Sequence, residues 1–315
     1  MIVNMSATAT KEQVEHVMDR IKECGFLPHL IQGAERTVIG VVGKNRGRRA
    51  EVEALKVAPG VEDIISISQP FTLVSLELQP NRTVVDVSGV KIGGPELIVM
   101  AGPCSVETEF QLLAIAHHVR LAGARILRGG AFKPRSFPYA FQGHGLEGLK
   151  MLARAREESG LPIVTEVMSE CDVPLVAEYA NILQIGTRNM ENYSLLEAAA
   201  LSGKPVLLKR GMVATIADFL RSAQVILDNG NPNVILCERG IRAFETAMRN
   251  TFDVAVIVLL KQISHIPVIA DPSHAAGCRD LVPALARIAV AAGATGFLSK
   301  STPILRRRGA TPTRH

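Results

Sequence analysis

One pattern repeats through most of the chain from Leu97 onward: an apolar strand, a polar or glycine-rich turn, and an amphipathic helix. The predicted strands are Leu97–Ala101, Arg125–Arg128, Pro162–Val167, Ile182–Ile185, Pro205–Lys209, Val234–Cys237, Pro267–Ala270 and Thr295–Leu298. Eight strands at spacings of about 20 to 37 residues predict a closed (β/α)8 barrel, the TIM barrel. The rival open sheet would carry a glycine-rich dinucleotide fingerprint after its first strand, and the run AGPCSV at that place is not one.

Helices are predicted between these strands because apolar residues recur there at helical spacing. Their ranges are Thr108–Ala122, Glu147–Ser159, Ser194–Ser202, Thr215–Asn229, Val254–Ser264 and Asp280–Ala292. Together with the strands they define a barrel domain over residues 79–315, which opens with a linker at 79–83 and a hairpin around Ser88 and Gly89.

Residues 1–78 are predicted to form a separate, small α+β domain. Helices are expected at Lys11–Cys24 and Arg48–Val57, and extended segments at Thr37–Val42, Ile64–Ile67 and Thr72–Leu78. Helices alternating with short strands in fewer than 80 residues favour a ferredoxin-like sandwich, a fold that by itself fixes no function.

The composition excludes several classes of function. With no Trp and three Tyr, the chain has little aromatic surface on which single-stranded nucleic acid bases stack. The basic run KNRGRR at residues 44–49 is short and isolated, which is more typical of a solvated turn than of a nucleic-acid patch. No stretch reaches about 18 consecutive apolar residues, and the N-terminus does not resemble a targeting signal. Five Cys without a CxxC motif fit a reducing compartment, so we expect a cytoplasmic protein without membrane or nucleic-acid partners.

Cations gather after the predicted strands of the barrel, above all in the loop RGGAFKPRS at residues 128–136. TIM barrels carry their chemistry at the C-terminal strand ends, where this chain has Arg128, Lys133, Arg135, Ser136, Glu166, Arg188, Lys209, Arg210, Glu238, Arg239 and Asp271. Each residue alone has an ordinary structural explanation, such as a salt bridge at a strand end. Together, cations from at least four strands repel one another unless anions lie between them, and they predict binding of more than one phosphate or carboxylate.

Cys104 and His274 follow the first and seventh predicted strands. Only the eighth strand separates these two strands in a closed barrel, so a thiolate and an imidazole can share a divalent metal there. Two ligands are an incomplete set, and we expect carboxylates from the eighth strand or its following loop to complete it.

With these residues assembled, the chain resembles the 3-deoxy-7-phosphoheptulonate (DAHP) synthases, in particular the class with an N-terminal ferredoxin-like regulatory domain. The matching runs are AGPCSVE (101–107), LRGGAFKPRS (127–136), QIGTRNM (184–190), VLLKRGM (206–212), ILCERG (235–240) and DPSHAAG (271–277). The resemblance implies condensation of phosphoenolpyruvate with erythrose 4-phosphate, the first step towards chorismate and the aromatic amino acids. It also implies inhibition by Tyr or Phe and a homo-oligomer, which we expect to be a tetramer.

The resemblance further implies roles for individual residues. Phosphoenolpyruvate would bind to Arg128, Lys133, Arg188, Lys209 and Arg239, and the phosphate of erythrose 4-phosphate to Arg135 and Ser136. A divalent metal (Mn, Fe, Co or Zn) would be held by Cys104, His274, a Glu and an Asp. The metal would stabilise the charge that develops on the aldehyde oxygen. Lys133 would either donate a proton to that oxygen or stabilise its charge, and Glu166 is a candidate for orienting water.

After Gly296 the chain departs from the family. The family continues with a Glu in an EVHP-like run, a later Asp and a last barrel helix, whereas residues 297–315 contain neither Glu nor Asp and show no amphipathic helix. We interpret this tail as a shift of the reading frame near Phe297, which the underlying DNA would reveal. The alternative is a natural variant with a replaced tail. In both cases we expect weak metal binding, low or no activity and a tendency to aggregate.

Two other functions remain open at this point. The sister 3-deoxy-octulosonate 8-phosphate synthases use arabinose 5-phosphate, but they have a KANRS-like loop where this chain has KPRS, and they lack the small N-terminal domain. The second alternative is a catalytically impaired barrel that binds anions or senses an aromatic amino acid. Binding of phosphoenolpyruvate or tyrosine without turnover would support it.

Overall fold

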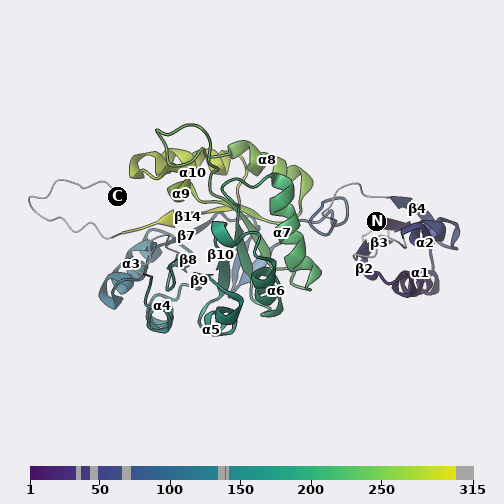
Figure 1. Ribbon diagram of the computed structural model, residues 1–315, viewed down its shortest axis with the longest axis horizontal. Helices are drawn as coiled ribbons and strands as arrows, with labels where there is room; N and C mark the ends of the chain where they lie inside the picture. Colours follow the sequence, from purple (N-terminus) through teal and green to yellow (C-terminus); the bar gives the residue numbers. More distant parts are fainter. Residues whose placement is uncertain (33–36, 43–48, 66–71, 134–138, 140–141, 303–315) are drawn as a thin grey trace, which may run out of the picture.

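A computed structural model describes the chain except for residues 33–36, 43–48, 66–71, 134–138, 140–141 and 303–315 (Figure 1). Two predictions fall outside the described residues: the phosphate site at Arg135 and Ser136, and the absence of a helix from residues 303–315. The described part contains a small N-terminal sheet with helices and a closed barrel.

The N-terminal unit is the predicted ferredoxin-like sandwich. Its elements are β1 (Ile2–Met5), α1 (Lys11–Glu23), β2 (Leu27–Gln32), β3 (Thr37–Val42), α2 (Arg49–Glu53), a 3-10 turn (Ala54–Val57) and β4 (Val61–Ile65). The antiparallel sheet has the order β2-β3-β1-β4. Helix α1 begins with a capping box in which Thr10 accepts from the Gln13 backbone, while the Gln13 side chain accepts from the Thr10 backbone.

Eight parallel strands close the barrel. They are β7 (Ile98–Gly102), β8 (Ile126–Arg128), β9 (Ile163–Val167), β10 (Ile182–Ile185), β11 (Val206–Lys209), β12 (Val234–Glu238), β13 (Val268–Ala270) and β14 (Gly296–Lys300). β14 pairs with β7 over five residue pairs, from Gly296 opposite Ile98 to Lys300 opposite Gly102. The chain therefore forms the eighth strand in spite of its departure from the family after Gly296.

Helices surround the barrel and confirm the six predicted ones. The outer helices are α3 (Glu109–Leu121), α4 (Leu146–Ser159), α5 (Val173–Tyr179), α6 (Tyr193–Leu201), α7 (Ile216–Asp228), α8 (Val254–Ile263) and α10 (Val282–Ala291). The sequence did not predict α5 or the short helix α9 (Pro272–Ala276), which follows β13. Both are too short to show a clear helical period. In the described part of the chain, no helix is both long and apolar enough to cross a membrane.

The interior of the barrel is an apolar core that is closed at its N-terminal end by a hairpin. Strands β5 (Val85–Val87) and β6 (Val90–Ile92) form the predicted hairpin. Its apolar side chains share one buried cluster with residues that point inward from the barrel strands, such as Met100 and Leu298. Because the hairpin fills this end, a ligand can approach the interior only from the C-terminal strand ends.

The segment that joins the two units is bound to the barrel. The Leu76 N–H donates to Ile263 O at 3.0 Å, and the Thr83 N–H donates to His265 O at 2.9 Å. The buried His265 ring lies between Leu73 O and Thr83 Oγ1, at 2.7 Å from each. The prediction of an extended segment at Thr72–Leu78 was wrong, because these residues form turns that follow the surface of the barrel.

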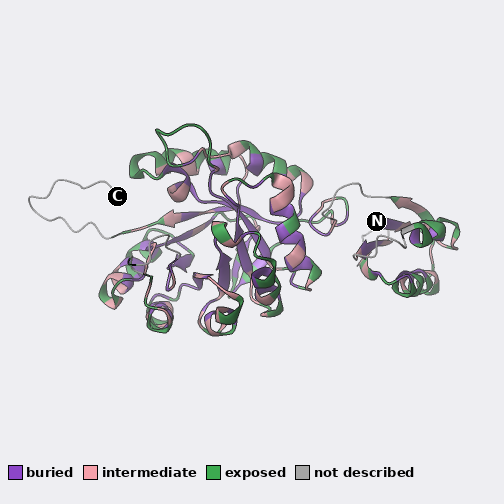
Figure 2. Ribbon diagram, in the orientation of Figure 1, coloured by how far each residue is buried: buried purple, intermediate pink, exposed green. Residues whose placement is uncertain are grey.

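The outer face of the barrel is less well covered at β7 and β14 than elsewhere. Outward side chains such as Leu127, Leu183 and Leu236 are fully buried under helices, whereas Val99 and Phe297 are only partly buried (Figure 2). Among the described residues, no helix follows β14. This is the position at which the sequence predicted an uncovered apolar flank.

Candidate active site

The side chains that line the mouth of the barrel can be identified from the alternation of the strands. Because successive side chains point to opposite faces, a residue two positions after an interior residue also faces inward. The interior cluster contains Ile126, Val164, Leu207, Cys237, Ile269 and Leu298. Two positions after each of these come Arg128, Glu166, Lys209, Arg239, Asp271 and Lys300. Charged side chains from different strands therefore meet at one end of the barrel, as the sequence predicted for five of these residues.

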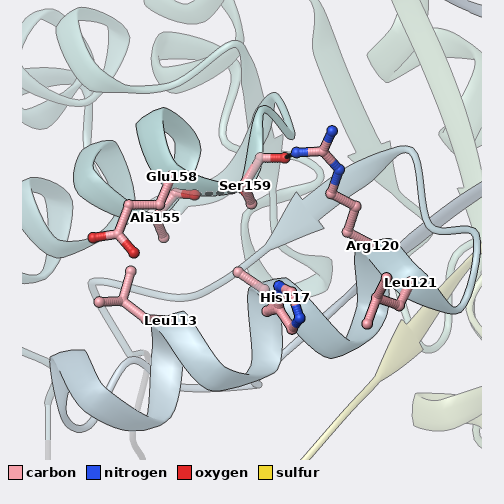
Figure 3. A pocket seen from close by; sticks show the side chains of 8 residues that line it. Leu113, His117, Arg120, Leu121, Ala155, Glu158 and Ser159 are labelled. Carbon is pink, nitrogen blue, oxygen red and sulfur yellow. Dashed lines mark hydrogen bonds between the residues drawn. The ribbon is translucent and has the colours of Figure 1, made fainter.

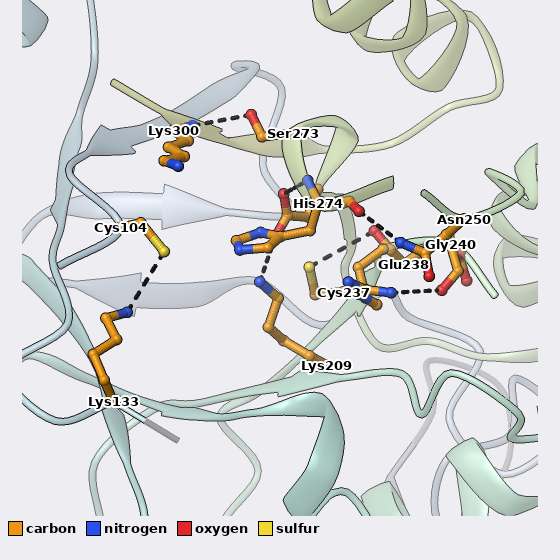
Figure 4. A network of polar contacts seen from close by, with 12 residues as sticks. Cys104, Lys133, Lys209, Cys237, Glu238, Gly240, Asn250, Ser273, His274 and Lys300 are labelled. Carbon is orange, nitrogen blue, oxygen red and sulfur yellow. Dashed lines mark hydrogen bonds and ion pairs between the residues drawn. The ribbon is translucent and has the colours of Figure 1, made fainter. Parts of the chain in front are cut away.

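Cys104, Lys133 and His274 form one corner of this mouth (Figure 4). Lys133 Nζ lies 3.6 Å from Cys104 Sγ, and His274 also contacts this sulfur. Burial alone would raise the pKa of Cys104, but the hydrogen bond to His274 and the charges of nearby cations lower it to about 4. The two predicted metal ligands thus lie together, and Cys104 is a thiolate at neutral pH.

Asp271 holds two of the predicted site residues in place. Its carboxylate forms an ion pair with Lys209 and lies 2.6 Å from His274 Nδ1, and it also accepts the His274 backbone N–H at 3.0 Å. Burial would raise the pKa of Asp271, but the charges of His274 and Lys209 hold it well below its usual range. Asp271 therefore orients the ammonium and the imidazole on either side of it.

Arg210 has a different role from its neighbours in the sequence. It follows the inward-facing Lys209 and points away from the mouth, where its Nη1 lies 2.9 Å from both Glu238 Oε2 and Asp253 Oδ2. Its Nε and Nη2 donate to Ala214 O at 3.2 and 3.1 Å. These contacts satisfy Arg210 within the protein, so we assign it to the support of the strand ends rather than to a ligand.

Three buried cations, in contrast, lack a carboxylate partner among the described residues: Arg128, Lys133 and Arg239. Arg128 Nη1 is buried without a hydrogen-bond partner, and Arg239 Nη1 donates only to Gly240 O at 3.2 Å. Burial lowers the pKa of both Lys133 and Arg239, because the charged forms have lost hydrating water. The Cys104 thiolate balances only one of these three charges, so the group is favourable only when a further anion occupies the space between them.

The structure describes one of the two remaining predicted contacts to substrate but not the other. Arg188 lies on an exposed 3-10 turn (Thr187–Asn189) after β10, where its side chain is accessible to solvent. Arg135 and Ser136 lie outside the described residues, so their predicted contact with the second phosphate remains a prediction.

Glu166 reaches the mouth because residue 186 is a glycine. A Cβ at Gly186 would overlap Glu166 Oε1, so any larger residue there has to displace the carboxylate. Glu166 is close enough to Lys133 for its charge to raise the pKa of that lysine, opposing the effect of burial. This places the candidate water-orienting residue next to the candidate proton donor.

Replacing Gly186 with Ala is expected to lower turnover about tenfold, because it moves Glu166 away from Lys133. Gly186 has a φ of −70°, which Ala adopts without strain, so the melting temperature should change little. Steady-state kinetics and thermal unfolding test this pair of effects. Gly203→Ala is the opposite control, because Gly203 has a φ of +69° at an exposed turn, so Ala there should lower the melting temperature and leave turnover unchanged. Unchanged turnover in Gly186→Ala would show that the position of Glu166 is not important.

The described residues do not supply the ligands of a complete divalent metal site. Cys104 and His274 are adjacent, yet no group of three or more His, Cys, Asp or Glu side chains that could hold an ion occurs in the described part of the chain. Asp271 is already paired with Lys209, and the eighth strand ends in Lys300 rather than in a carboxylate. Because metal sites in enzymes normally use at least three protein ligands, these residues do not fit the metal that the resemblance implies.

The sequence reasoning missed Lys300 as a residue of the mouth. The signal was present, since Lys300 lies two positions after the apolar Leu298 of the eighth predicted strand. That strand was predicted to end at Leu298, and the residues after it were treated only as a departure from the family.

A separate hollow lies between α3 and α4 on the outside of the barrel (Figure 3). It has a volume of about 400 Å³ and is lined by Leu113, Ala116, His117, Arg120, Leu121, Ala155, Glu158 and Ser159. Arg120 donates to Ser159 O across one end. The hollow contains none of the unpaired cations of the mouth, so we do not assign the chemistry to it.

Comparisons with known proteins agree with this arrangement. The profile of the DAHP synthetase I family matches residues 74–303, and that of the DAHP synthase ferredoxin-like domain matches residues 1–69. The chain is 45% identical over 304 residues to a phospho-2-dehydro-3-deoxyheptonate aldolase of Thermotoga maritima, covering 96% of this chain and 89% of the relative.

A crystal structure of phospho-2-dehydro-3-deoxyheptonate aldolase (DAHP synthase) from the same organism matches with a TM-score of 0.75 and 44% identity, covering 96% of this chain and 88% of that one. A 2-dehydro-3-deoxyphosphooctonate aldolase of Acidithiobacillus ferrooxidans is more distant. It is 32% identical over 223 residues, which cover 65% of this chain and 78% of the relative.

Proposed function

Because the chain belongs to the DAHP synthetase I family and carries a DAHP synthase ferredoxin-like domain before its barrel, we propose that it condenses phosphoenolpyruvate with D-erythrose 4-phosphate and releases phosphate. The proposal rests on three buried cations at the mouth of the barrel that have no carboxylate partner among the described residues. They are Arg128, Lys133 and Arg239. Phosphoenolpyruvate carries a phosphate and a carboxylate, which are the anions that such a set binds.

The proposed phosphoenolpyruvate site consists of Arg128, Lys133, Lys209 and Arg239 at the mouth, with Arg188 at its edge. Arg128 and Arg239 offer planar forks for bidentate contacts to oxygen atoms, and Lys209 is held towards the site by Asp271. The erythrose 4-phosphate phosphate would bind to Arg135 and Ser136 in the loop after β8.

The reaction follows from these positions. The enol carbon of phosphoenolpyruvate attacks the aldehyde carbon, a carbon–carbon bond forms, and the aldehyde oxygen gains negative charge. Lys133 donates a proton to this oxygen, and its lowered pKa makes it a stronger acid than a free lysine. Water, oriented by Glu166, then adds to the adjacent cationic carbon, and phosphate departs. Burial of the site strengthens each of these electrostatic effects.

The described residues supply only part of a metal site. Members of this family are metal-dependent, and Cys104 and His274 are the two described donors that a divalent ion such as Mn, Fe, Co or Zn would use. Such an ion would act as a Lewis acid on the aldehyde oxygen. Since the described residues offer only this pair of donors, the steps above rely on the protein's own side chains.

We also propose a regulatory role for the N-terminal domain, an oligomeric state and a cellular location. Residues 1–78 would form the regulatory domain, which binds an aromatic amino acid, and the barrel would assemble into a homo-oligomer, with a tetramer as our expectation. The support is the ferredoxin-like sheet at the predicted place. A reducing, cytoplasmic setting is supported by five cysteines that form no disulfide in the described part of the chain: Cys24, Cys104, Cys171, Cys237 and Cys278.

The test is product formation by the purified chain from phosphoenolpyruvate and either erythrose 4-phosphate or arabinose 5-phosphate, in EDTA and with added Mn²⁺. We expect slow formation of the heptulosonate phosphate, at a rate that EDTA does not change, and no octulosonate product. Turnover with arabinose 5-phosphate alone would assign the chain to the sister activity. Binding of phosphoenolpyruvate by a folded protein without any product would support the impaired barrel instead.

A further inference from the structure

Lys300 lies next to both segments that carry the residues expected to bind a metal. In the pairing of β14 with β7, Lys300 is opposite Gly102, and the following Ser301 N–H donates to Gly102 O at 2.9 Å. On its other side, the Lys300 N–H donates to Ser273 Oγ at 3.0 Å (Figure 4). Cys104 follows Gly102 by two residues, and His274 follows Ser273 directly. The backbone of Lys300 is thus fixed to both segments that carry the thiolate and the imidazole.

The side chain of Lys300 is directed towards the mouth and is available to a ligand. Leu298 belongs to the barrel interior, and alternation along β14 gives Lys300 the same direction. Lys300 is exposed, and it forms no salt bridge with any residue that the structure describes. Its ammonium therefore adds a positive charge on the side of the mouth where Lys133 already contacts the Cys104 sulfur.

A divalent cation is disfavoured by this combination. It would have to displace Lys133 from Cys104 Sγ, 3.6 Å away, and to bind beside a second ammonium with only two protein donors. An anionic substrate gains from the same charges, because the Lys300 ammonium attracts it from the strand that closes the barrel.

We propose that Lys300 is a substrate-positioning residue that replaces the charge of a metal ion: it attracts phosphoenolpyruvate and prevents a divalent ion from binding to Cys104 and His274. This inference rests on the proposed function only for the identity of the anion. Residues 297–315 contain no carboxylate that could bind a metal ion. The Lys300 ammonium supplies the positive charge that the ion would have supplied at this corner of the mouth.

Cobalt binding tests the exclusion of metal, because a Co²⁺–thiolate bond gives a charge-transfer absorption band. The native chain should show no such band at millimolar Co²⁺. Lys300→Glu supplies a third donor and removes the charge, so it should develop the band at Co²⁺ concentrations at least about 100-fold lower. Adding Cys104→Ala to Lys300→Glu should abolish the band and thereby locate the ion. A strong band in the native chain that Cys104→Ala removes would overturn the proposal.

Calorimetry with phosphoenolpyruvate in EDTA tests the attraction of substrate. Lys300→Met keeps the apolar stem and should bind about five- to tenfold more weakly, with Lys300→Gln as a second variant. Lys91→Met is the matched control, since it removes an exposed lysine from the hairpin at the closed end of the barrel and should bind normally.

The two proposals fail in different ways. Equal affinities of native chain and Lys300→Met for phosphoenolpyruvate would overturn the role of Lys300, whether or not the product forms. If no heptulosonate forms but binding depends on Lys300 as described, the role of Lys300 is supported and the proposed function is refuted.

Discussion

Replacing Arg128 with Gln is expected to weaken phosphoenolpyruvate binding by about 100-fold while leaving the ligand-free protein at least as stable as the native chain. Both effects have one cause. Arg128 is 4% exposed, its Nη1 has no hydrogen-bond partner, and it lies near the Cys104 thiolate and the Lys133 ammonium. A buried, unsatisfied guanidinium among other cations destabilises the empty protein, and it becomes favourable only when an anion binds.

Calorimetry with phosphoenolpyruvate and thermal unfolding without ligand test this prediction. Gln retains polar atoms and much of the volume, so the fold should be maintained. Arg188→Gln is a useful comparison, because Arg188 is exposed at the edge of the mouth and should affect affinity less and stability hardly at all. A lower melting temperature of ligand-free Arg128→Gln, with unchanged affinity, would show that Arg128 stabilises the fold and does not bind the substrate.

Much of this fold could be predicted from the sequence, because most barrel strands are long apolar runs with clear helices between them. The comparisons confirm the family, the fold class and the function that the six motifs predicted. Strand β2 pairs only with the following strand β3, and it was missed because Pro28 and His29 interrupt its apolar pattern. Strand β1 was missed because its neighbours in the sheet are distant in sequence, with Val3 opposite both Ile39 and Ile64. Propensity and pattern do not reveal such pairing.

The sequence predicted which residues lie at the candidate site, but not which of them form ion pairs with one another. The convergence of cations follows from strand order alone, and the contact between Cys104 and His274 was expected because only one strand separates the two strands that they follow. The sequence did not reveal which cations are neutralised. Lys209 with Asp271, and Arg210 with Glu238, are 62 and 28 residues apart. Only the three-dimensional structure separates these pairs from Arg128 and Arg239, which have no carboxylate partner among the described residues.

The tail changes the chemistry of the site more than the closure of the barrel. Backbone pairing of β14 requires no particular side chain, and Leu298 fills the interior as any apolar residue would. Position 300 is different, because its side chain faces the mouth, where the sign of its charge decides between attracting an anion and attracting a metal ion. For this reason the departure from the family after Gly296 leaves the predicted fold intact and alters the predicted metal site.

Replacing Arg210 with Met is expected to destabilise the protein by about 3–5 kcal/mol at neutral pH, the largest effect on stability that we predict. Arg210 Nη1 bridges Glu238 and Asp253, and without it the fully buried Glu238 carboxylate keeps only the Gly240 N–H at 2.6 Å. A buried carboxylate that has lost its counter-ion is strongly unfavourable. Urea unfolding measures the effect, and Arg128→Gln is the matched control because it removes a buried arginine that has no carboxylate partner.

The loss of stability in Arg210→Met should depend on pH in a defined direction. Burial already raises the pKa of Glu238 above its usual value of 4.5 in spite of Arg210, and removing Arg210 raises it further. A carboxyl with a raised pKa in the folded state stabilises the protein below its unfolded pKa, and this stability is lost as the pH rises through the folded pKa. The deficit should therefore shrink as the pH falls towards 4.5.

A second substitution separates the lost ion pair from lost packing. The double variant Arg210→Met with Glu238→Gln removes the buried charge and should recover most of the lost stability at neutral pH, since an uncharged amide needs no counter-ion. If the double variant is as unstable as Arg210→Met, and the deficit is the same at all pH values, the contribution of Arg210 lies in its contacts to Ala214 O and in packing. The distinction between buried cations that stabilise the fold through ion pairs with carboxylates and buried cations that bind a ligand would then not hold for this barrel.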